Sequence, residues 1–281
     1  MWLLRIPVTP ADIDLCEAAL EPHCLAVSRF IPDDGRPWRL EGVCDEEPDL
    51  ALVAAGLRAM GVAAQPAAEP LADRDWVVES YRGFPAMEVG RFHLHGSHVE
   101  GGAPAGKVGL LVDAAAAFGS GEHATTRGCL LALDGLDGRR LGRGLDMGCG
   151  TAVLAMAAAK AFGLSMLAID IDPVAVEVAA DNVRRNGLAG RVATAVGGSY
   201  GNRAVRRGAP YGLILSNILA NPLCGLAKGL AGSLAPGGVA ILSGFLTRDA
   251  LRVEEAHRRL GLRRIGRIVV EDWATLVLGR V

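Results

Sequence analysis

GLDMGCGTAVLAMAAAKAFGLSMLAIDIDP, residues 144–173, is the stretch of sequence that decides the fold. Apolar segments at 141–146 and 165–171 flank a glycine-rich turn at 147–150 and an alanine-rich segment at 151–162. These lengths and compositions predict a strand, a turn, a helix and a second strand. Because two strands joined by a helix run parallel, the stretch predicts an α/β sheet.

The glycines of the turn and the acid at the end of the second strand predict a nucleoside site. Gly148 and Gly150 lack a Cβ, so the backbone can turn sharply and approach a ligand closely. The helix that follows aims unpaired N–H groups at the same place. Asp170 ends the second strand, where a carboxylate can accept hydrogen bonds from ribose hydroxyls.

The spacing of the glycines separates the candidate cofactors. The dinucleotide fingerprint G-x-G-x-x-G would need glycine at position 153, which is Val153 in this chain. Asp146-x-Gly148-x-Gly150 instead resembles the first motif of S-adenosylmethionine-dependent methyltransferases. A generic strand-to-helix turn with an incidental aspartate is the alternative for this stretch alone.

Composition narrows the class of protein. The chain has 281 residues, 51% of them hydrophobic and 21% charged, which suffices for a packed core. A formal net charge of -2 gives no bulk basic field, so any contact with nucleic acid would have to be local. Six widely spaced cysteines without a C-x-x-C pair indicate neither a zinc site nor a disulfide framework. No signal peptide or membrane span is evident, which favours a cytoplasmic protein.

The first part of the chain predicts a small separate domain. Strand, helix, hairpin and helix patterns follow in the order βαββα within 1–62, which suggests an α+β, ferredoxin-like fold. Residues 63–75 contain two prolines and many alanines without a strong apolar period, so we expect a linker there. A second domain is then expected over 76–281.

The rest of the second domain predicts a Rossmann-like α/β sheet of about seven strands. Further strands are expected at 192–196, 211–216 and 238–243, and a final pair at 264–270 and 274–278. The short turn between the last two strands makes them antiparallel, as in class I methyltransferases and unlike dehydrogenases. The antiparallel strand pair and Val153 argue against the alternative class of enzyme, a nicotinamide-dependent oxidoreductase.

Two further motifs narrow the family. Phe118–Thr126 (FGSGEHATT) precedes the first strand of the opening unit, and Ser216–Ala220 (SNILA) follows the fourth. Together with DMGCG and DIDP, they resemble the family of methyltransferases that act on large-subunit ribosomal protein L11. The resemblance extends over essentially the whole chain, including Asp75-Trp76 and the closing Trp273-Ala-Thr-Leu-Val.

The resemblance implies transfer of methyl groups from S-adenosylmethionine to lysine side chains, the N-terminal amine, or both, of that ribosomal protein. It makes residues 1–62 a substrate-recognition domain, and it implies that the donor is bound by Thr126, Gly148, Asp170 and Asn217. Phe118 and His123 are expected on a loop that closes over the donor, and no catalytic base is evident.

The chain departs from the family pattern at two positions. Ala152 stands where the family usually has a third glycine, and Ser120 where it usually has threonine. The methyl group of Ala152 could crowd the cofactor. Ala152 also mildly favours a second alternative, a non-catalytic adaptor that retains a degenerate form of the cofactor-binding fold.

Other conspicuous residues have plain structural explanations. His93, His95 and His98 are expected to face solvent, because no cysteine or carboxylate pattern accompanies them, and no metal site is predicted. Cys149 is expected to be packed, and Asp146 to order the glycine turn by accepting backbone N–H groups. The arginines at 258–267 fit a solvated surface.

Overall fold

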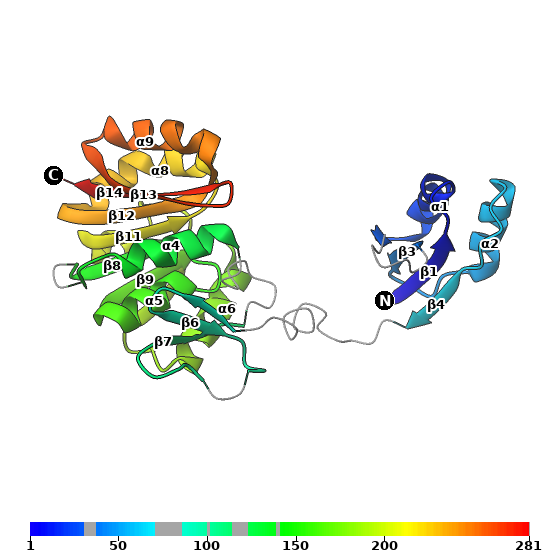
Figure 1. The fold of residues 1–281 in the computed structure, drawn as a ribbon, viewed down its shortest axis with the longest axis horizontal. Helices are drawn as coiled ribbons and strands as arrows, with labels where there is room; N and C mark the ends of the chain where they lie inside the picture. Colours follow the sequence, from blue (N-terminus) through cyan, green and yellow to red (C-terminus); the bar gives the residue numbers. More distant parts are fainter. Residues whose placement is uncertain (31–37, 71–85, 100–101, 114–122, 139–140, 281) are drawn as a thin grey trace. The chain divides into compact units, whose positions relative to one another are not determined.

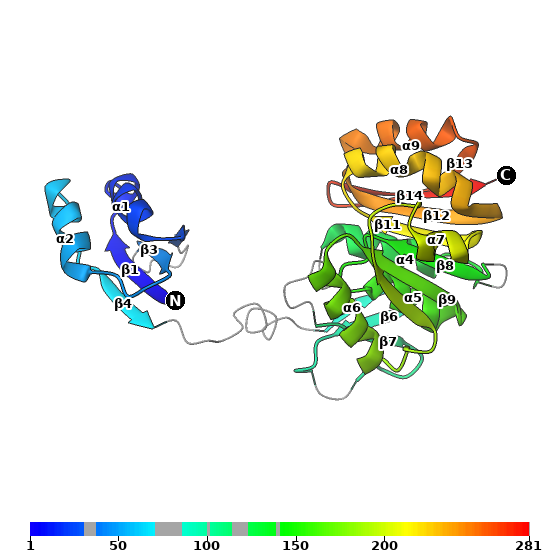
Figure 2. The same cartoon turned by 180° about the vertical axis from the view of Figure 1, so that it is seen from behind.

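The computed structural model describes residues 1–30, 38–70, 86–99, 102–113, 123–138 and 141–280. The chain divides into two compact units, Met1–Asp75 and Trp76–Val281. Both are drawn in Figures 1 and 2. In the described part of the chain, no helix is long and apolar enough to cross a membrane.

The first unit is a four-stranded antiparallel sheet with two helices. Its strands lie in the order β2-β3-β1-β4, and the helices pack on the sheet through a core that includes Leu4, Ile6, Leu20 and Leu57. The chain order βαββαβ confirms the ferredoxin-like prediction. In chain order the elements are β1 (Trp2–Val8), α1 (Ile13–Leu20), the 3-10 turn η1 (Glu21–His23), β2 (Ala26–Phe30), β3 (Trp38–Cys44), α2 (Leu50–Ala59) and β4 (Ala67–Pro70).

Strand β4 corrects one boundary. Ala67–Pro70 lies inside the expected linker 63–75, yet it pairs with β1 in the register Trp2↔Pro70 to Arg5↔Ala67. Its sequence, AAEP, has low strand propensity, so the strand depends on pairing with a neighbour that is distant in sequence. The first unit therefore extends past residue 62.

A three-stranded sheet opens the described part of the second unit. It consists of β5 (Met87–Val89), β6 (Phe92–His95) and β7 (Val108–Leu111), in that order. Phe92 and Leu110 are fully buried in the same hydrophobic cluster as helix α5 (Val153–Phe162), so this small sheet packs on the main domain.

The main sheet has seven strands in the order β10-β9-β8-β11-β12-β14-β13. All pairings are parallel except those of β14, which runs antiparallel to β12 and β13. The sheet and its terminal pair confirm the predicted fold class. The strands are β8 (Arg143–Met147), β9 (Ser165–Asp170), β10 (Val192–Val196), β11 (Tyr211–Asn217), β12 (Leu234–Leu246), β13 (Leu262–Val270) and β14 (Trp273–Arg280).

Helices cover both faces of this sheet, as Figures 1 and 2 show. In β11, Leu213 and Leu215 pack toward α4 to α6, whereas Ile214 packs toward α7 to α9. This alternation gives the domain two cores. Besides α5, the helices are α4 (Ala124–Asp134), α6 (Pro173–Arg185), α7 (Arg203–Gly208), α8 (Ala220–Ser233) and α9 (Ala250–Arg258), with the 3-10 turn η3 (Thr247–Asp249) before α9.

Candidate functional site

The glycine turn after β8 lies at the carboxyl edge of the sheet. Gly148 has φ 75° and Gly150 has φ 50°, both in the left-handed region that glycine adopts without strain. The amides of Gly148 and Cys149 donate to the carbonyl of Ile169, at 2.8 and 3.1 Å. A Cβ on Gly148 would lie 2.3 Å from Cγ2 of Ile218, so only glycine fits there.

Asp170, at the end of β9, stabilises the glycine turn through hydrogen bonds. Its Oδ2 accepts a hydrogen bond from the amide of Gly150 at 2.9 Å, and its Oδ1 accepts one from the amide of Asp172 at 3.1 Å. A carboxylate has about four acceptor positions, so two remain for a ligand. The predicted acid thus lies directly beside the predicted glycines.

Asp146 corrects another expectation. It was expected to order the glycine turn, but its Oδ2 accepts the amide of Ala155 in the first turn of α5, at 3.0 Å. The residue is only 1% exposed, and burial raises the pKa of its carboxyl to about 7. Asp146 therefore fixes the helix, while Asp170 fixes the turn.

Asn217, the last residue of β11, reaches α4. Its Nδ2 donates to Oγ1 of Thr126 at 3.4 Å, while its Oδ1 is buried and has no hydrogen-bond partner among the described residues. An unpaired buried carbonyl is costly, so a ligand N–H is the natural partner. The N-cap of α4 is His123, whose Nδ1 accepts the amide of Thr125 at 3.3 Å.

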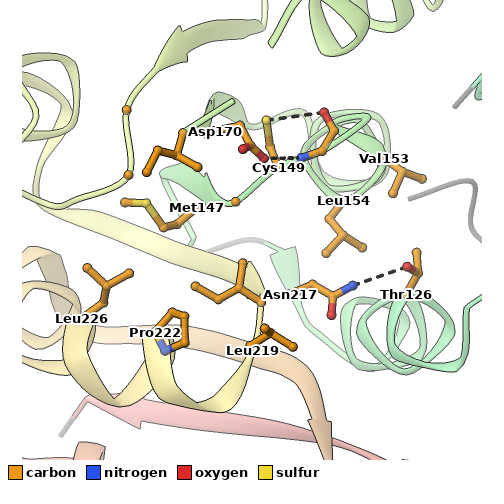
Figure 3. A pocket seen from close by; sticks show the side chains of 16 residues that line it. Thr126, Met147, Cys149, Val153, Leu154, Asp170, Asn217, Leu219, Pro222 and Leu226 are labelled. Carbon is orange, nitrogen blue, oxygen red and sulfur yellow. Dashed lines mark hydrogen bonds between the residues drawn. The ribbon is translucent and has the colours of Figure 1, made fainter. Parts of the chain in front are cut away.

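These residues surround a cavity of about 430 Å³. Thr126, Gly148, Asp170 and Asn217, the four predicted site residues, all line it, and Figure 3 shows Asp170 and Asn217 on different walls. The rest of the lining is mostly apolar: Met147, Cys149, Gly150, Val153, Leu154, Ile171, Gly197, Gly198, Ile218, Leu219, Pro222 and Leu226. The volume is that of an ordinary small-molecule site.

A second cavity of about 260 Å³ shares Asn217, Ile218 and Leu219 with the first. Its other lining residues are His123, Thr125, Gly244 and Trp273. The rings of His123 and Trp273 lie edge to face with centroids 4.6 Å apart. The two cavities therefore adjoin at Asn217, as a donor site and an acceptor site must in a group transfer.

Trp273 and Thr125 are site residues that the sequence did not identify. Trp273 opens the last strand and lies 150 positions from His123, so no local pattern joins them. The sequence signal was limited to the occurrence of Trp273 in the closing motif. Phe118 and Ser120 lie outside the described residues.

Ala152 takes the left-handed conformation, with φ 62°, directly before α5. Its side chain is fully buried and does not line the 430 Å³ cavity. The cost of alanine here is therefore backbone strain and not the crowding of a ligand that was expected. Cys149 is buried as expected, and burial raises the pKa of its thiol.

The histidines at positions 93, 95 and 98 do not all face solvent. His93 is 8% exposed, with its Nδ1 3.8 Å from a carboxylate oxygen of Glu88, which corrects the expectation. His95 is half-buried and His98 is exposed. Among the residues that the structure describes, no group of histidine, cysteine and carboxylate side chains could hold a metal ion.

Comparison with known proteins matches residues 41–280 to the family model "Ribosomal protein L11 methyltransferase (PrmA)". The chain is 40% identical over 237 residues to the ribosomal protein L11 methyltransferase of Rhizobium etli, covering 84% of this chain and 81% of the relative. It is 40% identical over 274 residues to that of Rhodopseudomonas palustris, covering 95% of this chain and 92% of the relative.

A solved structure agrees on the fold of the chain. The crystal structure of ribosomal protein L11 methylase from Lactobacillus delbrueckii subsp. bulgaricus superposes with a TM-score of 0.63 at 23% identity, covering 70% of this chain and 99% of that one. The family model matches most of the chain, and both relatives are 40% identical to it over most of their length. This chain belongs to the ribosomal protein L11 methyltransferase family.

Proposed function

We propose that this chain transfers methyl groups from S-adenosylmethionine to amino groups of ribosomal protein L11, on lysine side chains, the N-terminal amine, or both. Family membership makes the chain a methyltransferase that uses this donor and this substrate. One observation carries the choice of an amine as acceptor. The Oδ1 of Asn217 is buried where the two cavities adjoin and lacks a partner among the described residues.

The larger cavity is the donor site in this proposal. Asp170 would accept hydrogen bonds from the ribose hydroxyls through its remaining acceptor positions. Gly148 would let the backbone lie against the donor, since no side chain projects there. Ile171, which lines the same cavity and is 76% exposed, offers an apolar surface for the adenine ring.

The smaller cavity is the acceptor site. A target amine that enters between His123 and Trp273 would reach Asn217 and donate an N–H to its Oδ1. Thr126 fixes the orientation of the amide by accepting from its Nδ2. The lone pair of the amine would then face the methyl group of the donor.

The chemistry is a direct displacement. The neutral nitrogen forms a bond to the methyl carbon while the carbon–sulfur bond breaks, leaving a methylated ammonium and a neutral thioether. A lysine with a pKa of about 10.4 must first lose a proton, which costs about 4.6 kcal/mol at pH 7. The sulfonium charge lowers this cost by repelling the ammonium form, and the protons leave to water. The Asn217 carbonyl stabilises the charge that develops on nitrogen.

The first unit is proposed to hold the substrate protein, with the catalytic domain at 76–281. Both described cavities of the proposed reaction lie within the second unit, which leaves the first for recognition. Deleting residues 1–75 should leave calorimetric affinity for S-adenosylmethionine nearly unchanged and abolish methylation of the intact ribosomal protein. Methylation at the full-length rate by the folded truncated protein would contradict this division.

We also propose the cytoplasm as the place of action. The six cysteines are free, which fits a reducing compartment, and the net charge of -2 favours a protein substrate over bulk nucleic acid binding.

Calorimetric titration of the full chain separates the proposal from its alternatives. We expect S-adenosylmethionine and its homocysteine product to bind, and nicotinamide adenine dinucleotide not to bind. Binding of the dinucleotide alone would favour the oxidoreductase, and binding of none of the three would favour the adaptor.

A further inference from the structure

A third cavity lies at the amino edge of the sheet, opposite the donor site. It has a volume of about 300 Å³ and is lined by the first residues of β8, β9 and β11 and by the turn before β10. The lining residues that matter here are Arg143, which begins β8, and Arg191, which precedes β10. Among the described residues that line this cavity, none is acidic.

The backbone holds both guanidinium groups in place. Nη1 of Arg143 donates to the carbonyl of Gly208 at 3.3 Å, and Nη1 of Arg191 donates to the carbonyl of Gly163 at 2.7 Å. A guanidinium has five N–H donors in a fixed planar arrangement, so each side chain keeps donors for a ligand. Both residues are exposed.

The charge of these arginines is not compensated. In the described part of the chain, neither Arg143 nor Arg191 forms an ion pair with a carboxylate. Arginines elsewhere on the second unit commonly do, as in the pairs Arg185–Asp113, Arg252–Asp249 and Arg264–Glu254.

Helix α7 extends the positive surface. Ala204 and Gly208 line the cavity, and Arg207, three positions after Ala204, lies beside that face of the helix. Arg206 adjoins it, and both side chains are exposed without an ion pair to a described carboxylate. Arg206 and Arg207 lie in the last turn of α7, where positive charges interact favourably with the negative end of the helix dipole. The dipole does not account for Arg143 and Arg191, which come from other elements.

We propose that Arg143 and Arg191 form a phosphate-binding site at the amino edge of the sheet. Planar guanidinium groups bind phosphate oxygens in pairs, and two of them that line one cavity can contact the same phosphate group. The phosphate comes from an RNA backbone or from a small phosphate compound. The site is independent of the methyl-transfer site, since the two cavities share no residue.

The test compares two double variants of the full chain. In the site variant, Arg143→Gln with Arg191→Gln, glutamine keeps an N–H donor for the backbone carbonyls and removes the charge. In the control, Arg263→Gln with Arg267→Gln, two exposed arginines of β13 lose the same charge at another place. Fluorescence anisotropy measures binding of a labelled single-stranded RNA across a salt series. Thermal shift measures binding of inorganic phosphate and of pyrophosphate.

An RNA ligand predicts that the site variant binds about tenfold more weakly, with a salt slope smaller by about 1.4, because two phosphate contacts are lost. A small phosphate ligand predicts a thermal shift with phosphate or pyrophosphate in the original protein that disappears in the site variant. In both cases the control variant behaves as the original protein does. The proposal is wrong if no probe binds, or if both variants lose the same affinity.

Discussion

Asn217 and Thr126 are joined by a hydrogen bond of 3.4 Å from Nδ2 to Oγ1, which links the end of β11 to the first turn of α4 across 91 positions of sequence. The bond directs the donor half of the amide toward Thr126. The acceptor half, Oδ1, is left buried without a partner among the described residues. This arrangement places an unused carbonyl between the two adjoining cavities.

Asn217→Ala should therefore lower kcat more than donor affinity. Loss of a hydrogen bond to a developing charge costs about 1.5 to 3 kcal/mol, or roughly 10- to 150-fold in rate. The dissociation constant of S-adenosylmethionine should change by less than about threefold, since the bond forms with the amine. Kinetics and calorimetry on the same samples measure both quantities. Asn221→Ala, on the exposed start of α8, is the matched control, and equal losses in kcat and affinity for Asn217→Ala would mean that Asn217 only binds the donor.

Asp170→Ala should weaken donor binding. The change removes the acceptors proposed for the ribose hydroxyls. It also removes the acceptor of the Gly150 amide, so the glycine turn loses a stabilising hydrogen bond. We expect roughly 10- to 100-fold lower affinity by calorimetry. Asp181→Ala, on an exposed position of α6, controls for the loss of one carboxylate. An unchanged affinity in Asp170→Ala would rule out the ribose assignment.

Local sequence patterns predicted the parts of the site that depend on local geometry. Gly148, Gly150 and Asp170 could be placed because a strand-turn-helix-strand unit brings its own turn and its own strand end together. The neighbourhood of His123 and Trp273 could not be predicted, because it depends on how β14 lies in the completed sheet. The partner of Asp146 depends on the packing of α5, which the sequence does not specify.

Strand β4 and helix α7 were not predicted either, for two different reasons. Strand β4, with sequence AAEP, forms because β1 offers a free edge. Helix α7 has six residues, too few for an apolar period to be recognised. Long strands that are apolar and buried at nearly every position, such as β11, carry their own signal.

Ala152→Gly should stabilise the protein without changing donor affinity. An alanine in the left-handed conformation destabilises the folded state by about 1 to 2 kcal/mol, and glycine removes this strain. Glycine also makes the unfolded chain more flexible, which lowers the stability of the fold by about 0.4 to 1 kcal/mol. The net increase in the free energy of unfolding should lie between roughly 0 and 1.6 kcal/mol, measured by urea denaturation. Since the Ala152 methyl does not line the donor cavity, the dissociation constant should stay within about twofold. Tighter donor binding without a gain in stability would indicate crowding after all.

Asp146 should make stability depend on pH. Burial raises the pKa of its carboxyl to about 7 in the folded protein, against about 3.9 in an unfolded chain. The folded state thus binds the proton more tightly, and the stability that this contributes is complete below about pH 4 and lost as pH rises to about 7. The full effect is on the order of a few kcal/mol.

Asp146→Asn is the test of this pH dependence. Asparagine cannot ionise, and its carbonyl can still accept the amide of Ala155. The free energy of unfolding of the original protein, minus that of the variant, should therefore fall between pH 4 and pH 7. A difference that stays constant over this range would show that the carboxyl does not titrate there.

Methyl transfer to the substrate protein itself tests the central claim most directly. The full chain is incubated with S-adenosylmethionine and purified ribosomal protein L11, and the methylated positions are mapped by mass spectrometry. The account predicts methyl groups on lysine side chains or the N-terminal amine, formed much more slowly by Asn217→Ala. If the protein binds the donor and the ribosomal protein yet adds no methyl group to any amine, the account is contradicted.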